Sequence, residues 1–167
     1  SYKRQESMEY SPVIVFCYNR PGHLNNLLYS LEQNKESLDT DVYIYIDGCE
    51  NEKDLKDNKS VIKIAEQEWK FKSKKIVVRN TNFGLRKNIV EGITEVIRKN
   101  KKVIVLEEDL YVSPKFLDYM NKCLTKYENK KKIMHISGWN YQFKFPVINN
   151  DVFFSRYMNC WGWATWK

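Results

Sequence analysis

The sequence has few cysteines, and no pattern organises them. It shows no CxxC spacing and no dense framework, which argues against a structural zinc site and a disulfide scaffold and fits free thiols in a reducing compartment. The four cysteines are Cys17, Cys49, Cys123 and Cys160. No apolar stretch approaches the roughly 20 residues of a membrane span, and the polar tail, residues 1–11, does not resemble a signal peptide. We therefore expect a cytoplasmic protein.

Two phosphate-binding motifs are also absent. No GxGxxG follows the first predicted strand and no GxxxxGK[ST] occurs, which disfavours a dinucleotide-binding fold and a P-loop. The 167 residues, 43% hydrophobic, suit one globular domain. The net charge of +7 allows anionic partners and peripheral association with the inner face of a membrane. Because the basic residues are spread along the chain, we do not expect nucleic-acid binding.

Strand and helix patterns alternate along the chain. Such alternation predicts an α/β, Rossmann-like domain over residues 12–167, with a mostly parallel sheet and helices on both faces. Apolar runs predict strands at 13–17, 41–47, 76–78, 103–106, 133–137 and 152–154. Helical spacing predicts helices at 22–34 and 61–69, and helices that open near residues 83 and 114.

An acid cluster follows the fourth predicted strand. The apolar run 103–106 leads directly into Glu107, Glu108 and Asp109. Three packed like charges disfavour one another's ionisation, and a cation would reverse that penalty. Carboxylate oxygens suit Mg²⁺ or Mn²⁺. The pattern therefore indicates a divalent-metal site, and the alternative is a solvated acidic turn that binds nothing.

Other polar residues follow the neighbouring strands. Ligands of such sheets bind outside the carboxyl ends of the strands, where we expect Asn19, Arg20, Asp47 and Asn82 to join the acid cluster. Three of these residues have a structural alternative: a strand-end ion pair for Arg20, a turn with Gly48 for Asp47 and a helix cap for Asn82.

Four segments carry a resemblance to a known group of enzymes. They are 12–21 (PVIVFCYNRP), 82–86 (NFGLR), 105–110 (VLEEDL) and 160–166 (CWGWATW). In this order they resemble bacterial family 2-like sugar transferases of the GT-A fold, and the N-acetylglucosaminyltransferase I family. The resemblance implies a metal-dependent, inverting glycosyltransferase of polysaccharide or glycoconjugate biosynthesis. It would move a sugar from a nucleotide-diphosphate donor, expected to be a UDP-sugar, to a glycan acceptor.

The resemblance also implies roles for single residues. In this DxD-like cluster Asp109 maps to the metal ligand, while Glu108 and Glu107 map to contacts with ribose and donor sugar. Glu108 departs from the more common Asp at its position. Asp47 maps to the base contact, and Arg20 would lie near the nucleotide. Arg86 would lie near the diphosphate, with an exposed surface position as its alternative; a guanidinium suits phosphate oxygens.

The aromatic end of the chain completes these predictions. Trp161 and Trp163 would form a platform for acceptor or donor sugar, because flat aromatic faces suit sugar rings; the alternative is core packing. An inverting transferase needs a general base, and in the resembling enzymes it follows this segment. We therefore expect a C-terminally truncated chain that holds the donor site. The competing hypotheses are an inactive sugar-nucleotide-binding or scaffolding domain, and a nucleotidyltransferase.

Overall fold

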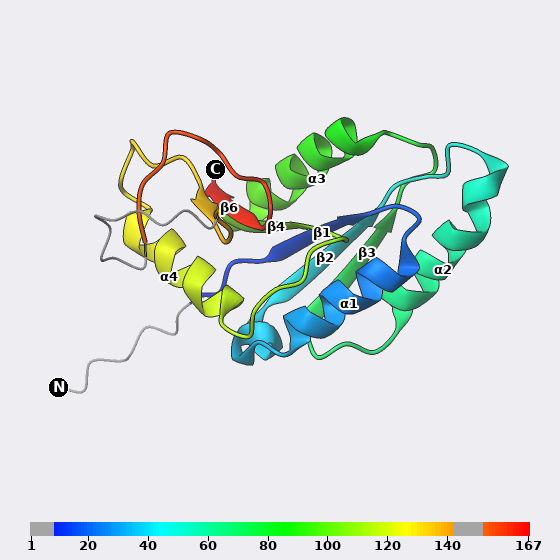
Figure 1. Ribbon diagram of the computed structural model, residues 1–167, viewed down its shortest axis with the longest axis horizontal. Helices are drawn as coiled ribbons and strands as arrows, with labels where there is room; N and C mark the ends of the chain where they lie inside the picture. Colours follow the sequence, from blue (N-terminus) through cyan, green and yellow to red (C-terminus); the bar gives the residue numbers. More distant parts are fainter. Residues whose placement is uncertain (1–8, 142–151) are drawn as a thin grey trace.

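A six-stranded sheet runs through the part of the chain that the computed structural model describes, residues 9–141 and 152–167. Its strand order is β3-β2-β1-β4-β6-β5 (Figure 1). The strands are β1 (Val13–Cys17), β2 (Asp41–Ile46), β3 (Ser73–Val78), β4 (Lys102–Glu107), β5 (Ile136–Ser137) and β6 (Trp163–Trp166). The first four are parallel, and β6 pairs antiparallel with β4 and β5. The predicted mostly parallel sheet is confirmed.

Helices cover both faces of this sheet, as predicted. Figure 1 shows α3 on one face and α1, α2 and α4 on the other. The helices are α1 (Pro21–Glu32), α2 (Leu55–Glu66), α3 (Leu85–Asn100) and α4 (Phe116–Tyr127), with short 3₁₀ turns η1 (Lys35–Asp39) and η2 (Glu52–Asp54). Within the described ranges, no helix combines the length and hydropathy needed to cross a bilayer.

The central strand β1 is buried on both faces because each face packs on a different layer. Val13 and Val15 contact the core beneath α1, α2 and α4, while Ile14 and Phe16 contact the core beneath α3. This alternation follows from the two-residue period of a strand. Gly92 allows α3 to approach closely, since a Cβ there would lie 2.7 Å from Cε1 of Phe16.

Several elements differ from the sequence prediction, and β3, for example, begins at Ser73 rather than at residue 76. Helix α2 begins at Leu55, within the charged segment, and ends before Trp69; charged side chains such as Lys and Glu are good helix formers, and the hydrophobic pattern alone missed that first turn. The strand predicted at 133–137 shortens to β5. The prediction of a strand at 152–154 is wrong, because these exposed residues are not part of any strand in the described part of the chain.

Strand β6 is a finding of the structure. Trp163–Trp166 pairs with β4 in the register Val105↔Trp163. From the sequence, this segment was predicted only as an aromatic platform. The pairing fills the side of β4 opposite β1, so the strand that carries the acid cluster has a neighbour on each side. Two pairings hold β4 in place, and they thereby position the acids that follow it.

Candidate functional site

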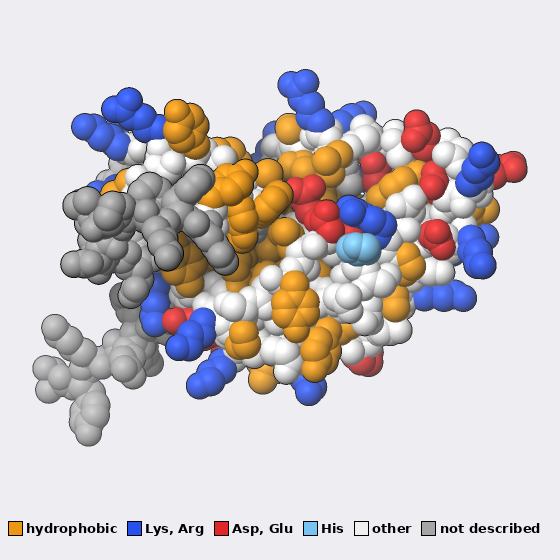
Figure 2. All heavy atoms as spheres, in the orientation of Figure 1, with side chains coloured by type: hydrophobic (Ala, Val, Ile, Leu, Met, Phe, Trp, Pro, Cys, Tyr) orange, Lys and Arg blue, Asp and Glu red, His pale blue; other side chains and the backbone are white. Residues whose placement is uncertain are grey.

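The candidate site lies where β1, β2 and β4 end. Because these strands are parallel, the loop after β1, Asp47 after β2 and the acid cluster (Glu107–Asp109) after β4 meet at one edge of the sheet. Figure 2 shows acidic and basic side chains lying side by side near the middle of the molecular face that it presents. The structure therefore brings together most of the residues that the sequence placed at this edge.

Arg20 and the acid cluster form the centre of the site. The Nε and Nη2 atoms of Arg20 both lie 2.8 Å from Oε1 of Glu108, and Nη1 lies 3.3 Å from Oδ2 of Asp109. The side chain of Glu108 is 7% exposed and that of Asp109 is 46% exposed. One guanidinium thus joins the end of β1 to the end of β4, which is the strand-end ion pair named as the alternative for Arg20.

Glu107 differs from its two neighbours. Burial raises the pKa of the half-buried Glu107 carboxyl, and the charges of Asp109 and Glu108 raise it further, while Arg20 acts in the opposite direction. The increase agrees with the sequence argument that packed carboxylates disfavour one another's ionisation. An added cation near these three acids would relieve that repulsion.

Asp47 is buried and its Oδ1 atom serves the backbone. This oxygen accepts hydrogen bonds from the N–H of Gly48 at 2.9 Å and from the N–H of Phe83 at 2.8 Å. The Asn58 side chain donates to the Asp47 carbonyl at 2.9 Å. The Asp47 carboxylate therefore forms the turn with Gly48 and also attaches the β3–α3 loop to the end of β2.

The β3–α3 loop packs tightly against that turn. A Cβ on Gly48 would lie 2.4 Å from the Thr81 carbonyl carbon, so the close approach requires glycine. The Asn82 amide donates to the Gly48 carbonyl at 2.8 Å, and its Oδ1 accepts from the N–H of Gly84 at 3.0 Å. Asn82 thus bridges two loops, and the residue at the N-cap of α3 is Gly84.

Arg86 is separate from the acid cluster. It lies exposed in the first turn of α3, beside a shallow hollow of about 500 Å³ that Phe83, Lys87 and Val90 also line. Across the described residues, no hydrogen bond or ion pair joins Arg86 to Glu107, Glu108 or Asp109. The structure therefore brings Arg20, rather than Arg86, into contact with the acids.

A further acid near the site, Asp54, was not predicted from the sequence. The carboxylate of Asp54 accepts from the Tyr18 hydroxyl at 2.8 Å and from the Asn19 amide at 2.7 Å. The Tyr18 hydroxyl accepts in turn from the N–H of Glu50 at 3.0 Å. These bonds hold the loop after β1 against η2. No local spacing signals them, because the partners lie 35 and 36 residues apart.

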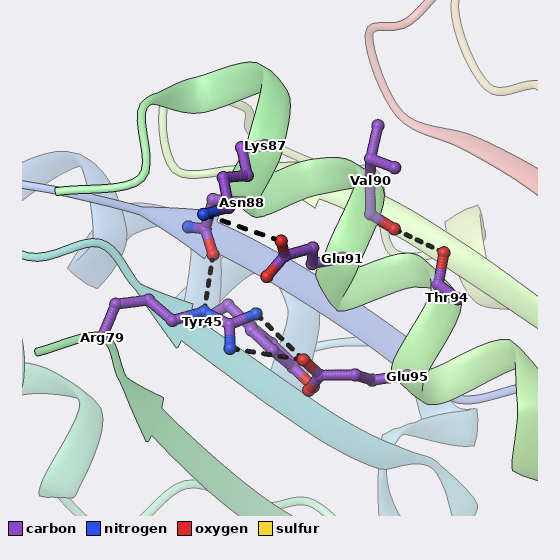
Figure 3. A network of polar contacts seen from close by, with 8 residues as sticks. All are labelled: Tyr45, Arg79, Lys87, Asn88, Val90, Glu91, Thr94 and Glu95. Carbon is purple, nitrogen blue, oxygen red and sulfur yellow. Dashed lines mark hydrogen bonds and ion pairs between the residues drawn. The ribbon is translucent and has the colours of Figure 1, made fainter. Parts of the chain in front are cut away.

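A polar network on the α3 face was missed as well (Figure 3). Arg79 donates to Glu95 and to Asn88, and its guanidinium lies 5.0 Å from the centre of the Tyr45 ring. The Tyr45 hydroxyl donates to Glu95 at 2.7 Å. Burial would raise the pKa of Glu95, but the hydrogen bonds from Tyr45 and Arg79 leave it below its usual value. This network fixes α3 against β2 and β3.

The two tryptophans of the predicted platform are in different environments. Trp161 is 49% exposed and its ring centre lies 4.4 Å from that of Trp139, which approaches Tyr141 at 4.7 Å. Trp163 lies in β6 and is partly buried against the core beneath α3. Trp161 thus belongs to a largely exposed aromatic group, while Trp163 packs partly against the core.

The acid cluster is suited to a hard divalent cation by its ligand type. Asp109 presents an exposed carboxylate, and Glu107 adds a second, half-buried one. Within residues 9–141 and 152–167, no group of three His, Cys, Asp or Glu is arranged as a metal site. Mg²⁺ keeps several waters and commonly uses one or two carboxylates together with substrate phosphates, and Asp109 and Glu107 are carboxylates of that kind.

Comparisons with known proteins identify the family and the fold. The chain matches the GNT-I family over residues 2–165, and a search of curated proteins finds no match. Its fold resembles TarS from S. aureus, with a TM-score of 0.51 and 19% identity over 71% of this chain and 20% of that chain. It also resembles the mannosyltransferase PcManGT from Pyrobaculum calidifontis in complex with GDP-Man and Mn²⁺. That TM-score is 0.55, with 12% identity over 80% of this chain and 39% of that chain.

The chain thus spans a minor part of the length of both solved relatives. The structural matches confirm the predicted fold, a Rossmann-like domain of the GT-A type. The family match also confirms the resemblance drawn from segments 12–21, 82–86, 105–110 and 160–166. Because it covers nearly every residue, the chain belongs to the GNT-I family.

Proposed function

We propose that this chain is the donor-binding domain of a glycosyltransferase, comprising residues 12–167 and preceded by the polar tail, residues 1–11. It transfers a sugar from a nucleotide-diphosphate donor, a UDP-sugar, to a glycan or glycoconjugate acceptor, with inversion. The observation that carries this proposal is the group formed by Arg20, Glu108 and Asp109 at the carboxyl edge of the sheet. Family membership supports it.

In this proposal Asp109 holds the divalent cation, with Glu107 beside it. The carboxylate of Asp109 is accessible, and its contact with Arg20 at 3.3 Å is the longest in the group. When bound, Mn²⁺ or Mg²⁺ acts as a Lewis acid that stabilises charge on the departing diphosphate. Because one fold relative was solved with GDP-Man and Mn²⁺, a test of this proposal should include GDP-sugars and Mn²⁺.

The remaining residues bind and orient the donor. Arg20 neutralises charge near the nucleotide, because a guanidinium matches phosphate oxygens in geometry. Glu107 contacts the donor sugar and Glu108 the ribose. The Asp47 carboxylate, whose Oδ1 already fixes the β3–α3 loop, contacts the base through its other oxygen.

Three further residues extend the donor site outward. Asn19 and Asn82 border the nucleotide from the loops that they stabilise, and Arg86 approaches the diphosphate from the first turn of α3. Trp161 offers an exposed ring to a sugar, and Trp163 supports it from β6. The net charge favours peripheral association with an anionic membrane surface.

The experiment that tests the proposal is an assay of nucleoside diphosphate release from a panel of UDP- and GDP-sugars with Mn²⁺ and glycan acceptors. Wild-type protein is compared with Asp109→Ala and with Lys122→Met, a substitution on the distant helix α4. We expect release from the wild type and the Lys122 variant and none from Asp109→Ala. Donor binding without release from any sugar would favour the second candidate, a sugar-nucleotide-binding module.

A further inference from the structure

Arg20 contacts its two acids unequally. It holds Oε1 of the buried Glu108 through two nitrogens, each at 2.8 Å. The contact with the exposed Asp109 uses one nitrogen at 3.3 Å. Short bonds to a buried carboxylate are strong, because that carboxylate has few other partners, whereas an exposed contact is screened by water. The Asp109 contact is therefore the one that exchanges more readily.

Glu108 fixes the position of this cation. Its side chain is only 7% exposed, and loss of Arg20 would leave a buried charge without its partner. The guanidinium is thus attached at the end of β4 even when it leaves Asp109. Glu108 acts through Arg20 and is a positioning residue in this respect.

A divalent cation on Asp109 would lie beside this fixed positive charge. The guanidinium competes for the same carboxylate and repels the metal, so metal alone binds weakly. A nucleoside diphosphate would change that balance, because its phosphate oxygens would accept from the guanidinium and would also be suitable ligands for the metal. The guanidinium and the metal, which repel each other in the free protein, would then both be attracted to the diphosphate.

We propose that Arg20, held by Glu108, couples the binding of metal to the binding of nucleoside diphosphate. It suppresses binding of the cation to Asp109 in the free protein and promotes it once the diphosphate is present. Such coupling is reciprocal, so the metal raises the affinity for the diphosphate by the same factor. The inference rests on the proposed donor site and adds a binding order and a residue responsible for it.

The test is a titration of Mn²⁺ into the full chain, with free Mn²⁺ measured by electron paramagnetic resonance, with and without UDP. We expect Arg20→Met to bind Mn²⁺ alone about tenfold more tightly than wild type, within the 5- to 150-fold that coupling between sites typically spans. UDP should raise the Mn²⁺ affinity of wild type about tenfold and change that of Arg20→Met far less.

Three companion variants isolate the charge of Arg20. Arg20→Lys keeps the charge and should bind Mn²⁺ alone as wild type does. Lys122→Met removes an exposed cation that pairs with Asp118 on α4 and should change nothing. The double substitution of Arg20→Met with Glu108→Gln removes the unpaired buried charge, and it should reproduce the tighter Mn²⁺ binding if the single variant folds poorly.

The outcomes separate this inference from the proposed function. Equal Mn²⁺ affinity of wild type, Arg20→Met and the double variant, with binding still abolished by Asp109→Ala, would overturn the coupling and leave the metal site intact. Mn²⁺ binding that persists in Asp109→Ala would instead overturn the metal site itself. Failure of all variants to bind Mn²⁺ in the presence of UDP would overturn both.

Discussion

Removal of the Asp47 carboxylate should loosen the β3–α3 loop. Asp47→Ala deletes the acceptor of two backbone hydrogen bonds, from the N–H of Gly48 at 2.9 Å and of Phe83 at 2.8 Å. Hydrogen bonds to a charged group contribute about 1.5–3 kcal/mol each, so the free energy of unfolding should fall by about 3–6 kcal/mol. In a chain of this size that loss lowers Tm by roughly 6–24 °C.

Asp47→Asn is the matched control for this substitution. Its amide oxygen accepts the same two bonds, but a neutral acceptor forms bonds of about half the strength, so the expected loss is about 1.5–3 kcal/mol. Urea unfolding measures both variants, and hydrogen exchange of the Phe83 amide reports the loop directly. A loss below about 1 kcal/mol for Asp47→Ala, or equal losses for the two variants, would refute the role assigned to this carboxylate.

Two further predictions concern the α3 face of the sheet. Gly92→Ala should lower the free energy of unfolding by about 1–3 kcal/mol, because its methyl group would lie 2.7 Å from the Phe16 ring. Gly22→Ala, with open space around it, is the control. Equal effects of the two substitutions in chemical denaturation would contradict the packing argument. Glu95 has a lowered pKa, so its ionisation stabilises the fold above its unfolded pKa, and that contribution is lost as the pH falls through the folded value. Thermal melts should therefore show that the wild type is more stable than Glu95→Gln at pH 7 and loses this advantage towards pH 3. The difference is under about 1 kcal/mol, because the carboxylate is screened by water. A difference that stays constant with pH would contradict the role of the network.

The apolar runs predicted the parallel part of the sheet because burial on both faces leaves a distinct signal. Val13–Cys17 and Val103–Leu106 are continuous hydrophobic runs, and they form the two central parallel strands. Strand β6 carries no such signal, because its pairing with β4 joins residues about 60 positions apart. By composition, its tryptophans fit an exposed binding surface as well as they fit a strand. Tertiary pairing decided what local pattern left open.

The site was predictable in its location and less so in its contacts. The topology alone brings the ends of β1, β2 and β4 together, so Arg20, Asp47 and the acid cluster were named from sequence. The sequence could not predict that Arg20 bonds Glu108, or that Asp47 binds the backbone of Phe83. Those bonds depend on side-chain directions in loops, which have no periodic pattern.

Calorimetric titration of UDP tests the central claim most directly, with and without Mn²⁺, on wild type and Asp109→Ala. The donor-site account predicts that Mn²⁺ tightens the binding of UDP to wild type and that this gain disappears in Asp109→Ala. Binding of equal affinity with and without Mn²⁺, unchanged by Asp109→Ala, would contradict the assignment of the acid cluster to a metal-bound diphosphate.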